Sequence, residues 1–362
     1  MALRFPARAA LVAATLLAPA TLFAQAQDRS IDRMADRIAD LAERIAASAQ
    51  EGAARIADRV EKSLRDGERR RAERERLERD LESGAQERRV RIDTTLALAA
   101  DATLDLSMVS GTIVVTAWGR PEARLVARAP HGHLDLSASA MRVRLEEIRE
   151  KRWRRGGDDD GGRVEVSVPR GVRIVARTTS GDLVVRGTTG DVDGSTVSGD
   201  IRLEELRGRI DVSTVSGDVV ARRVDGDVEV SAVSGDVTLT VLTGSLRAST
   251  TSGTLRLEGI EARHVDASTL SGDLDFTGPL DAAGRYEFKA HSGDVVLHLA
   301  GAANARFSLE TFSGDLDFDF PVTLQPTDRG ARRGRRLTFS IGEGGASVLA
   351  STFSGDLQIR KH

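Results

Sequence analysis

The 362-residue chain lacks cysteine, has few aromatic residues and carries almost no net charge. Without cysteine it can form no disulfide framework, perform no thiol chemistry and carry no lipidated cysteine. Because aromatic residues make up only 4%, the core must be built mainly from Val, Leu, Ile, Ala and Thr. The 52 basic and 55 acidic residues nearly cancel, so no overall field favours nucleic acid. We expect no nucleic-acid partner.

Long apolar runs are also missing, except near the N-terminus. The run Ala9–Phe23 follows Arg4 and Arg8 and precedes the small-x-small sequence Ala24-Gln25-Ala26. This order is typical of a cleaved signal peptide, and the run is shorter than the ~20 residues that span a bilayer. We therefore expect a signal peptide at residues 1–26 and an exported protein, in the periplasm or at the cell surface. After cleavage no transmembrane span is expected; a retained anchor is the alternative.

Residues 27–89 are rich in charge and show a helical period. Apolar side chains recur at alternating steps of three and four, at Ile31, Met34, Ile38, Leu41 and Ile45, and the pattern resumes at Ile56, Val60 and Leu64. An Arg/Glu-rich stretch follows. The pattern predicts a long charged helix. The helix is either a coiled-coil stalk through which the chain forms a homo-oligomer, or a single charged helix.

From about residue 90 the chain is organised by a repeated Ser-Gly-Asp triplet. Copies begin at Ser180, Ser198, Ser216 and Ser234, 18 residues apart; Ser252-Gly253-Thr254 keeps the step, and later copies begin at Ser271, Ser292, Ser313 and Ser354. A second glycine column lies midway, at Gly190, Gly208, Gly226 and Gly244. Self-similarity at a fixed period indicates a repeat architecture.

Between these turns apolar and polar residues alternate, which predicts strands with one dry and one wet face. Residues 90–362 are therefore predicted to be an all-β domain. Stacked coils would bury the dry face, whereas an open meander would exceed the ~10 strands that such sheets usually hold. We predict a parallel β-solenoid, right-handed, with about 18–21 residues per coil. An antiparallel β-meander or sandwich is the alternative.

Stacking would place equivalent residues in columns. After the glycine column the residues Asp191, Arg209, Asp227, Ser245 and Arg263 largely alternate in sign, which favours coil-on-coil register. The triplet aspartates, in contrast, are like charges in a row. Either each aspartate bonds the backbone of its own turn, or the row binds Ca²⁺. We favour the turn, because the nonapeptide of calcium-binding solenoids is missing.

These residues also carry a resemblance. The triplets, preceded by Val166-Ser167-Val168-Pro169-Arg170-Gly171, resemble a bacterial family of exported domains of unknown function, described as adhesins with β-strand repeats. The segment from Ser110-Gly111-Thr112 to Trp118 is similar to its first repeat. The resemblance covers about Val90 to Arg360. It implies a β-solenoid-like fold and an adhesive or envelope role, and it brings no catalytic residues.

Patterns for chemistry are sparse. His131-Gly132-His133 has no third ligand at metal spacing, and Asp158-Asp159-Asp160 lacks the ligand pattern of a calcium loop. The serines lie in ladders without a nucleophile elbow, and no phosphate-binding loop is present. We expect no enzymatic activity and no cofactor.

Two Arg-rich loops, near residues 149–162 and 327–336, interrupt the repeats. Insertions on repeat scaffolds often bind ligands, and Arg suits phosphate and carboxylate groups. The candidate contacts to an anionic partner are Arg152, Trp153, Arg154, Arg155, Arg332, Arg333, Arg335 and Arg336. The alternative is a loop kept soluble by its charge.

The predicted function is that of a non-enzymatic exported repeat protein, an adhesin or a scaffolding element of the cell envelope. The alternative is an envelope-sensing module, or one that binds an anionic polymer such as lipopolysaccharide or another polysaccharide.

Overall fold

The computed structural model describes residues 91–129, 133–148, 162–301, 304–319 and 335–361. These ranges contain strands and turns and no helix, so the predicted all-β fold is confirmed. They accordingly contain no apolar helix of membrane-spanning length. The predicted signal peptide and helical segment lie outside them, and their boundaries stay predictions.

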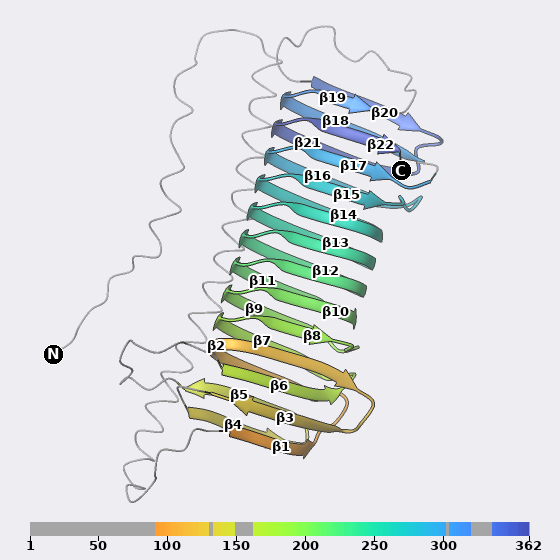
Figure 1. Cartoon of the computed structure of the whole chain (residues 1–362). Coiled ribbons are helices and arrows are strands. Elements are labelled where there is room, and N and C mark those ends of the chain that lie inside the picture. Colours follow the sequence, from red (N-terminus) through yellow and green to blue (C-terminus); the bar gives the residue numbers. More distant parts are fainter. Residues whose placement is uncertain (1–90, 130–132, 149–161, 302–303, 320–334, 362) are drawn as a thin grey trace, which may run out of the picture.

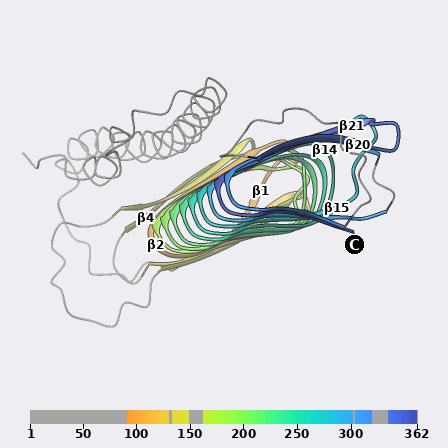
Figure 2. The ribbon, with the colours of Figure 1, turned by 90° about the horizontal axis from the view of Figure 1, so that it is seen from above.

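Successive repeats stack into a rod, with one repeat per coil (Figure 1). β9 (Val192–Ser198) pairs in parallel with β11 (Ile210–Ser216), and β8 (Leu183–Arg186) pairs with β10 (Ile201–Arg207). In both pairs each residue faces the one 18 positions further on. The triplet corner separates the two strands of a coil, as the spacing predicts. Seen along the rod, the two strand layers enclose a flattened core (Figure 2).

In the middle of the rod single strands continue through the second corner, where the register shifts once, at Gly244/Ser245. β12 (Val219–Ser234), β13 (Val237–Ser252) and β14 (Leu255–Ser271) each run through that corner as one bent strand. β15 (Leu274–Gly278) and β16 (Arg285–Ser292) pair in parallel with β14.

At the N-terminal end the spatial order of coils departs from the sequence order. β2 (Thr103–Trp118) lies between two coils. On one side it pairs with β5 (Arg142–Ile148) and β6 (Gly162–Pro169), and on the other with β7 (Arg173–Ser180) and β8. Ser110 faces Ser180, so the predicted first repeat does occupy a triplet corner.

Antiparallel strands complete this end. β3 (Glu122–Arg128) pairs with β6 and with β1 (Arg91–Ala97), while β4 (His133–Ser139) pairs with β5.

The C-terminal end shows a similar insertion. β17 (Val295–Leu299) completes the coil of β16, and β18 (Ala305–Ser313) and β19 (Leu316–Phe318) form another coil. β21 (Ala346–Ser354) and β22 (Leu357–Lys361), although last in the sequence, lie between these two coils and pair in parallel with both.

β20 (Arg335–Ile341) then closes this end, antiparallel to β18. Because a solenoid ends in an unpaired strand edge, antiparallel strands can cover that edge. The sheet is therefore mixed, parallel between repeats and antiparallel at the ends, and not parallel throughout. The right-handed winding stays a prediction.

The core consists of stacked aliphatic columns. One column follows the triplets with Leu183, Ile201, Val219 and Val237, all fully buried. Towards the C-terminal end aromatic side chains enlarge the core, at Phe276, Tyr286, Phe288 and Phe307. The phenol of Tyr286 donates to the carbonyl of Ala262 at 2.7 Å and accepts from the amide of Asp281 at 2.7 Å.

The triplet corner requires glycine for two reasons. Gly217 has a φ of 144°, and a Cβ there would lie 2.1 Å from the carbonyl oxygen of Gly199 in the neighbouring coil. The corner glycines of successive coils are thus stacked too closely for any side chain. The recurrence of glycine in the triplets follows from this contact.

The triplet aspartates bond along the rod, and the expectation that each bonds its own turn is wrong. Asp182 Oδ1 accepts from the amide of Asp200 at 3.0 Å, and Asp200 Oδ1 accepts from Asp218 at 3.1 Å. The ladder continues through Asp236 to the amide of Thr254. Each carboxylate therefore ties its coil to the next.

The second corner contains a feature without a glycine signature. Glu205, Arg223 and Val241 have φ values of 58°, 54° and 57°, in the left-handed region. They form a column 18 residues apart, which ends at Gly259 with a φ of 64°. Glu205 and Arg223 form an ion pair at 2.8 Å, whereas Val241 is 52% exposed. The predicted glycine column at Gly208, a few residues on, is part of the same corner.

Candidate functional site

Most of the predicted anionic-partner contacts fall outside the described residues. This holds for Arg152, Trp153, Arg154, Arg155, Arg332 and Arg333. Arg335 opens β20, but its side chain is not described. The side chain of Arg336 forms an ion pair with Glu310 at 3.2 Å across the β18–β20 pair.

The two Arg-rich segments are anchored far apart. The first joins β5 to β6 at the N-terminal end of the rod, and the second joins β19 to β20 at the C-terminal end (Figure 1). Their contacts to a partner stay predictions. The strands that flank the two segments lie at opposite ends of the rod and share no surface.

A groove with a volume of about 560 Å³ lies on the outer face just after the second corner, over five successive coils. We call it the charged groove. β11, β12, β13, β14 and β16 supply its lining, which is Arg209, Ile210, Asp227, Val228, Glu229, Ser245, Leu246, Arg247, His264, Val265, Asp266, Arg285 and Glu287. The period-two alternation places its charged side chains outward, while Ile210, Val228 and Leu246 point into the core.

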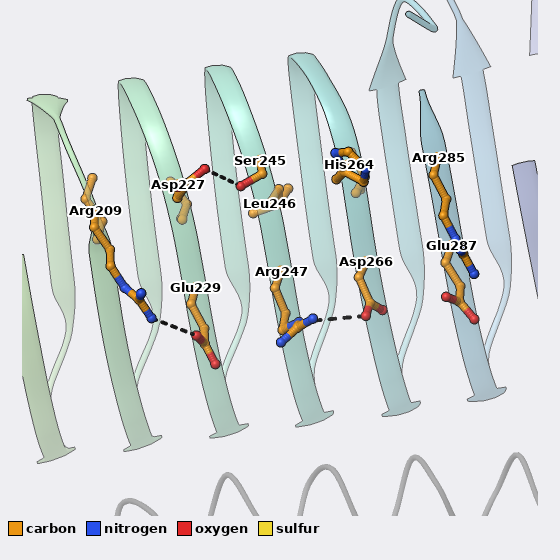
Figure 3. A pocket seen from close by; sticks show the side chains of 13 residues that line it. Arg209, Asp227, Glu229, Ser245, Leu246, Arg247, His264, Asp266, Arg285 and Glu287 are labelled. Atoms are coloured by element: carbon orange, nitrogen blue, oxygen red, sulfur yellow. Dashed lines mark hydrogen bonds and ion pairs between the residues drawn. The ribbon is translucent and has the colours of Figure 1, made fainter. Parts of the chain in front are cut away.

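Ion pairs in the charged groove connect neighbouring coils (Figure 3). Arg209 lies 3.9 Å from Glu229, and Arg247 lies 3.8 Å from Asp266. The hydroxyl of Ser245 donates to the carboxylate of Asp227. Exposed pairs of this kind contribute less than about 1 kcal/mol each, so a charged ligand can replace them at little cost.

One cation of the groove has no such partner. Among the described residues, no carboxylate forms an ion pair with the exposed Arg285. Its neighbour Glu287 is instead paired with Lys289. Arg285 is therefore the groove side chain best placed to receive an anionic group.

The structure corrects the predicted charge column. One residue is inserted in β14, so Ser245 faces His264 and Arg263 is displaced from the column. Arg263 instead forms an ion pair with Asp281 at 3.3 Å. Within the column the amide of Arg209 donates to Asp191. The side chain of Arg209 pairs instead with Glu229, two residues beyond Asp227, which follows Arg209 in the column. Opposite charges do alternate along the rod, but the sequence could not show that the inserted residue breaks the column.

Chemistry-bearing clusters are scarce in this part of the chain. The described ranges contain no group of three or more His, Asp or Glu side chains arranged to hold a metal ion. Of the two motifs rejected as ligand sites from their sequence, His131 and the Asp158–Asp160 tract lie outside these ranges. The structure therefore directs attention to outer surfaces of the rod.

Comparison with known proteins adds the family. The comparison with curated proteins gave no match. A crystal structure described as a "putative cell adhesion protein" from Clostridium sporogenes ATCC 15579 is 8% identical, covering 75% of this chain and 100% of that chain. Its TM-score is 0.23, too low to support an argument about fold or function.

The model of one family, described as Toastrack DUF4097, matches residues 162–248 and 243–360. Together these matches run from residue 162 to residue 360, which is 199 of 362 residues and more than half of the chain. The chain belongs to the Toastrack DUF4097 family.

Proposed function

We propose that the chain is a non-enzymatic, exported rod of the cell envelope that acts by binding, as an adhesive or scaffolding element. The observation that carries the proposal is the charged groove, which extends over five successive coils of a rod built from repeats. Extended surfaces of stacked repeats serve as binding faces in other repeat proteins.

The groove suits a polymer better than a small molecule. Coils follow one another at about 4.8 Å, so its charged side chains recur at short, regular intervals along the rod. A chain of linked polar units can contact several coils at once, and such contacts gain from being tethered together. Because the internal ion pairs are weak, the groove exchanges them for ligand contacts without a large penalty.

Retention on isolated cell envelopes tests the proposal. The full chain with Arg247→Glu and Arg285→Glu should be retained at least fivefold less than the unaltered chain. The matched control reverses two arginines on the outer face of the other strand layer, Arg202→Glu and Arg256→Glu, and should bind normally. Equal retention of all three proteins would remove the groove from consideration.

A second candidate, binding of an anionic polymer, is favoured by one observation: Arg285 in the groove forms no ion pair with a carboxylate among the residues that the structure describes. Lipopolysaccharide is the probe, with a neutral dextran as the comparison. Arg285→Gln should reduce lipopolysaccharide binding, whereas deletion of residues 150–160 would do so only if the predicted Arg152–Arg155 contacts take part. Equal binding to both polymers would contradict this candidate.

The exported location is also a proposal. It predicts that cell fractionation recovers the chain in the periplasm or at the surface, shortened by the mass of about residues 1–26. Recovery of the uncleaved chain in the cytosol would contradict it.

A further inference from the structure

One outward column of the rod is apolar where an outer strand face is expected to be polar. It consists of the residue that directly precedes the triplet serine in eight successive coils, from Ser198 on; in the coil before them this residue is the exposed Thr179. In stacking order it begins with Val197, Val215, Val233, Thr251 and Leu270, all partly exposed. We call this column, with the three aromatic residues that continue it, the apolar stripe.

The aromatic part of the stripe is ordered by stacking. The ring of His291 stacks on Phe353 with centroids 5.0 Å apart, and Phe353 stacks on Phe312 at 4.9 Å. Burial lowers the pKa of His291, which favours its neutral ring. Eight coils in succession therefore present a mostly apolar side chain outward, over roughly 34 Å at the usual strand spacing. Contiguous exposed apolar surface of this kind marks an interaction site.

The chain enters the rod at the edge along which the stripe runs. Arg91, the first described residue, faces Arg128 in β3, and Arg128 faces Arg163 in β6. The next residue back, Gly162, faces Gly111 at a triplet corner. The 90 residues that precede Arg91 are thus attached at one end of the triplet edge.

Those preceding residues include a complementary seam. The predicted seam has two parts, Ile31 to Ile45 and Ile56 to Leu64, and the whole segment would extend roughly 50 Å as a helix, enough to cover the stripe. Residues 65–90, at ~3.3 Å each when extended, reach any point along it.

The positions of the arginines in this segment are compatible with the same docking site. Arginines directly precede five seam residues, at Arg33, Arg37, Arg44, Arg55 and Arg59, within a segment that carries six basic and seven acidic residues. The stripe, for its part, is flanked around the triplet corner by the aspartate ladder that includes Asp200, Asp218 and Asp236. Seam apolar residues can therefore pack on the stripe while arginines face carboxylates.

We propose that the apolar stripe is the docking site for the chain's own N-terminal amphipathic segment, residues 31–64, within the same molecule. The segment covers the triplet edge of the rod and leaves the charged groove, after the other corner, open. This inference is independent of what the groove binds.

Thiol labelling tests the proposal directly, because the chain has no cysteine of its own. In the full chain Val215→Cys places one thiol on the stripe, and its rate of reaction with a small maleimide is measured. Val241→Cys, at a position that is 52% exposed, is the accessible reference. We expect Val215→Cys to react at least tenfold more slowly than the reference.

Substitutions in the segment then identify the cover. Ile38→Glu with Leu41→Glu should raise the Val215→Cys rate at least fivefold. Ala39→Glu with Ala46→Glu adds the same charge away from the seam and should leave the rate unchanged. Far-UV circular dichroism confirms that the rod stays folded, since none of these four residues belongs to it.

Two outcomes overturn the proposal. If the labelling rate of Val215→Cys is the same with and without the seam substitutions, residues 31–64 do not cover the stripe. Protection that depends on protein concentration, with dimers in sedimentation, shows that a second copy supplies the segment, as the coiled-coil prediction would have it.

Discussion

Replacing one aspartate of the ladder separates its hydrogen bond from its charge. Asp218 accepts the amide of Asp236 at 2.9 Å, and its own amide donates to Asp200 at 3.1 Å. Asp218→Asn keeps an oxygen acceptor and removes the charge. Asp218→Ala removes both, so the difference between the two variants reports the hydrogen bond.

The two effects are of similar size. At a spacing of about 4.8 Å in water, two carboxylates repel by roughly 0.9 kcal/mol, so Asp218 with two neighbours contributes about 1.7 kcal/mol of repulsion, less in salt. A hydrogen bond to a charged acceptor contributes about 1.5–3 kcal/mol, and exposure of Asp218 moves it to the lower end. We expect Asp218→Asn to be neutral or stabilising at low salt, and Asp218→Ala to be about 1–2 kcal/mol less stable than Asp218→Asn.

Urea unfolding at 20 and 500 mM NaCl measures these differences. Added salt should stabilise the unaltered chain more than it stabilises Asp218→Asn, because the variant has already lost the two repulsions between Asp218 and its neighbours that salt would screen. If Asp218→Ala is as stable as Asp218→Asn at both salt concentrations, the carboxylate-to-amide ladder contributes nothing to coil stacking, and the reasoning fails.

Three further substitutions test other parts of the rod. Gly217→Ala should cost at least about 3 kcal/mol, because its Cβ would lie 2.1 Å from a backbone oxygen, whereas Gly119→Ala, with nothing within 4 Å, should change stability little in the same urea assay. Val241→Asn should raise the free energy of unfolding by about 0.5–1 kcal/mol, and with it the melting temperature, because a β-branched residue is strained at a φ of 57°. Val241→Thr keeps the β-branch and should not raise the stability. Burial raises the pKa of Tyr286 above 10.0, so its contribution to stability is complete below about pH 10 and is lost as the pH rises through the folded-state pKa. Tyr286→Phe should flatten this alkaline loss while costing about 1–3 kcal/mol at neutral pH through two unpaired backbone groups, and the absorbance of the single tyrosine follows the titration directly.

The candidate surfaces were only partly visible in the sequence. The alternating charges at Arg209 and Asp227 indicated stacking, but they did not indicate a groove, since that depends on how five coils lie beside one another. The apolar residues before each serine, such as Val215 and Phe353, could have been found from the same repeat alignment. They were hidden because a single outward apolar residue in a strand is unremarkable until its neighbours are known to be stacked.

The chain's sequence by itself determined the unit of this protein. A period of 18, two turns per repeat and alternation of apolar residues predict a strand–corner–strand coil, because an open antiparallel meander of so many strands would exceed the usual size of such sheets. Glycine in each triplet follows from contact between successive corners, which every coil has in common. The coil depends on local spacing, and the glycine depends on a contact that each pair of neighbouring coils repeats.

Only the tertiary structure decided the order of the coils. β21 and β22 lie between coils that precede them in the sequence, and β2 lies between coils that both follow it. Repeats of nearly the same residues can pair with almost any other repeat, so local pattern does not specify the neighbour. Which coil lies beside which depends on the antiparallel strands at the two ends, including β3 and β20. These strands pair with residues far apart in the chain.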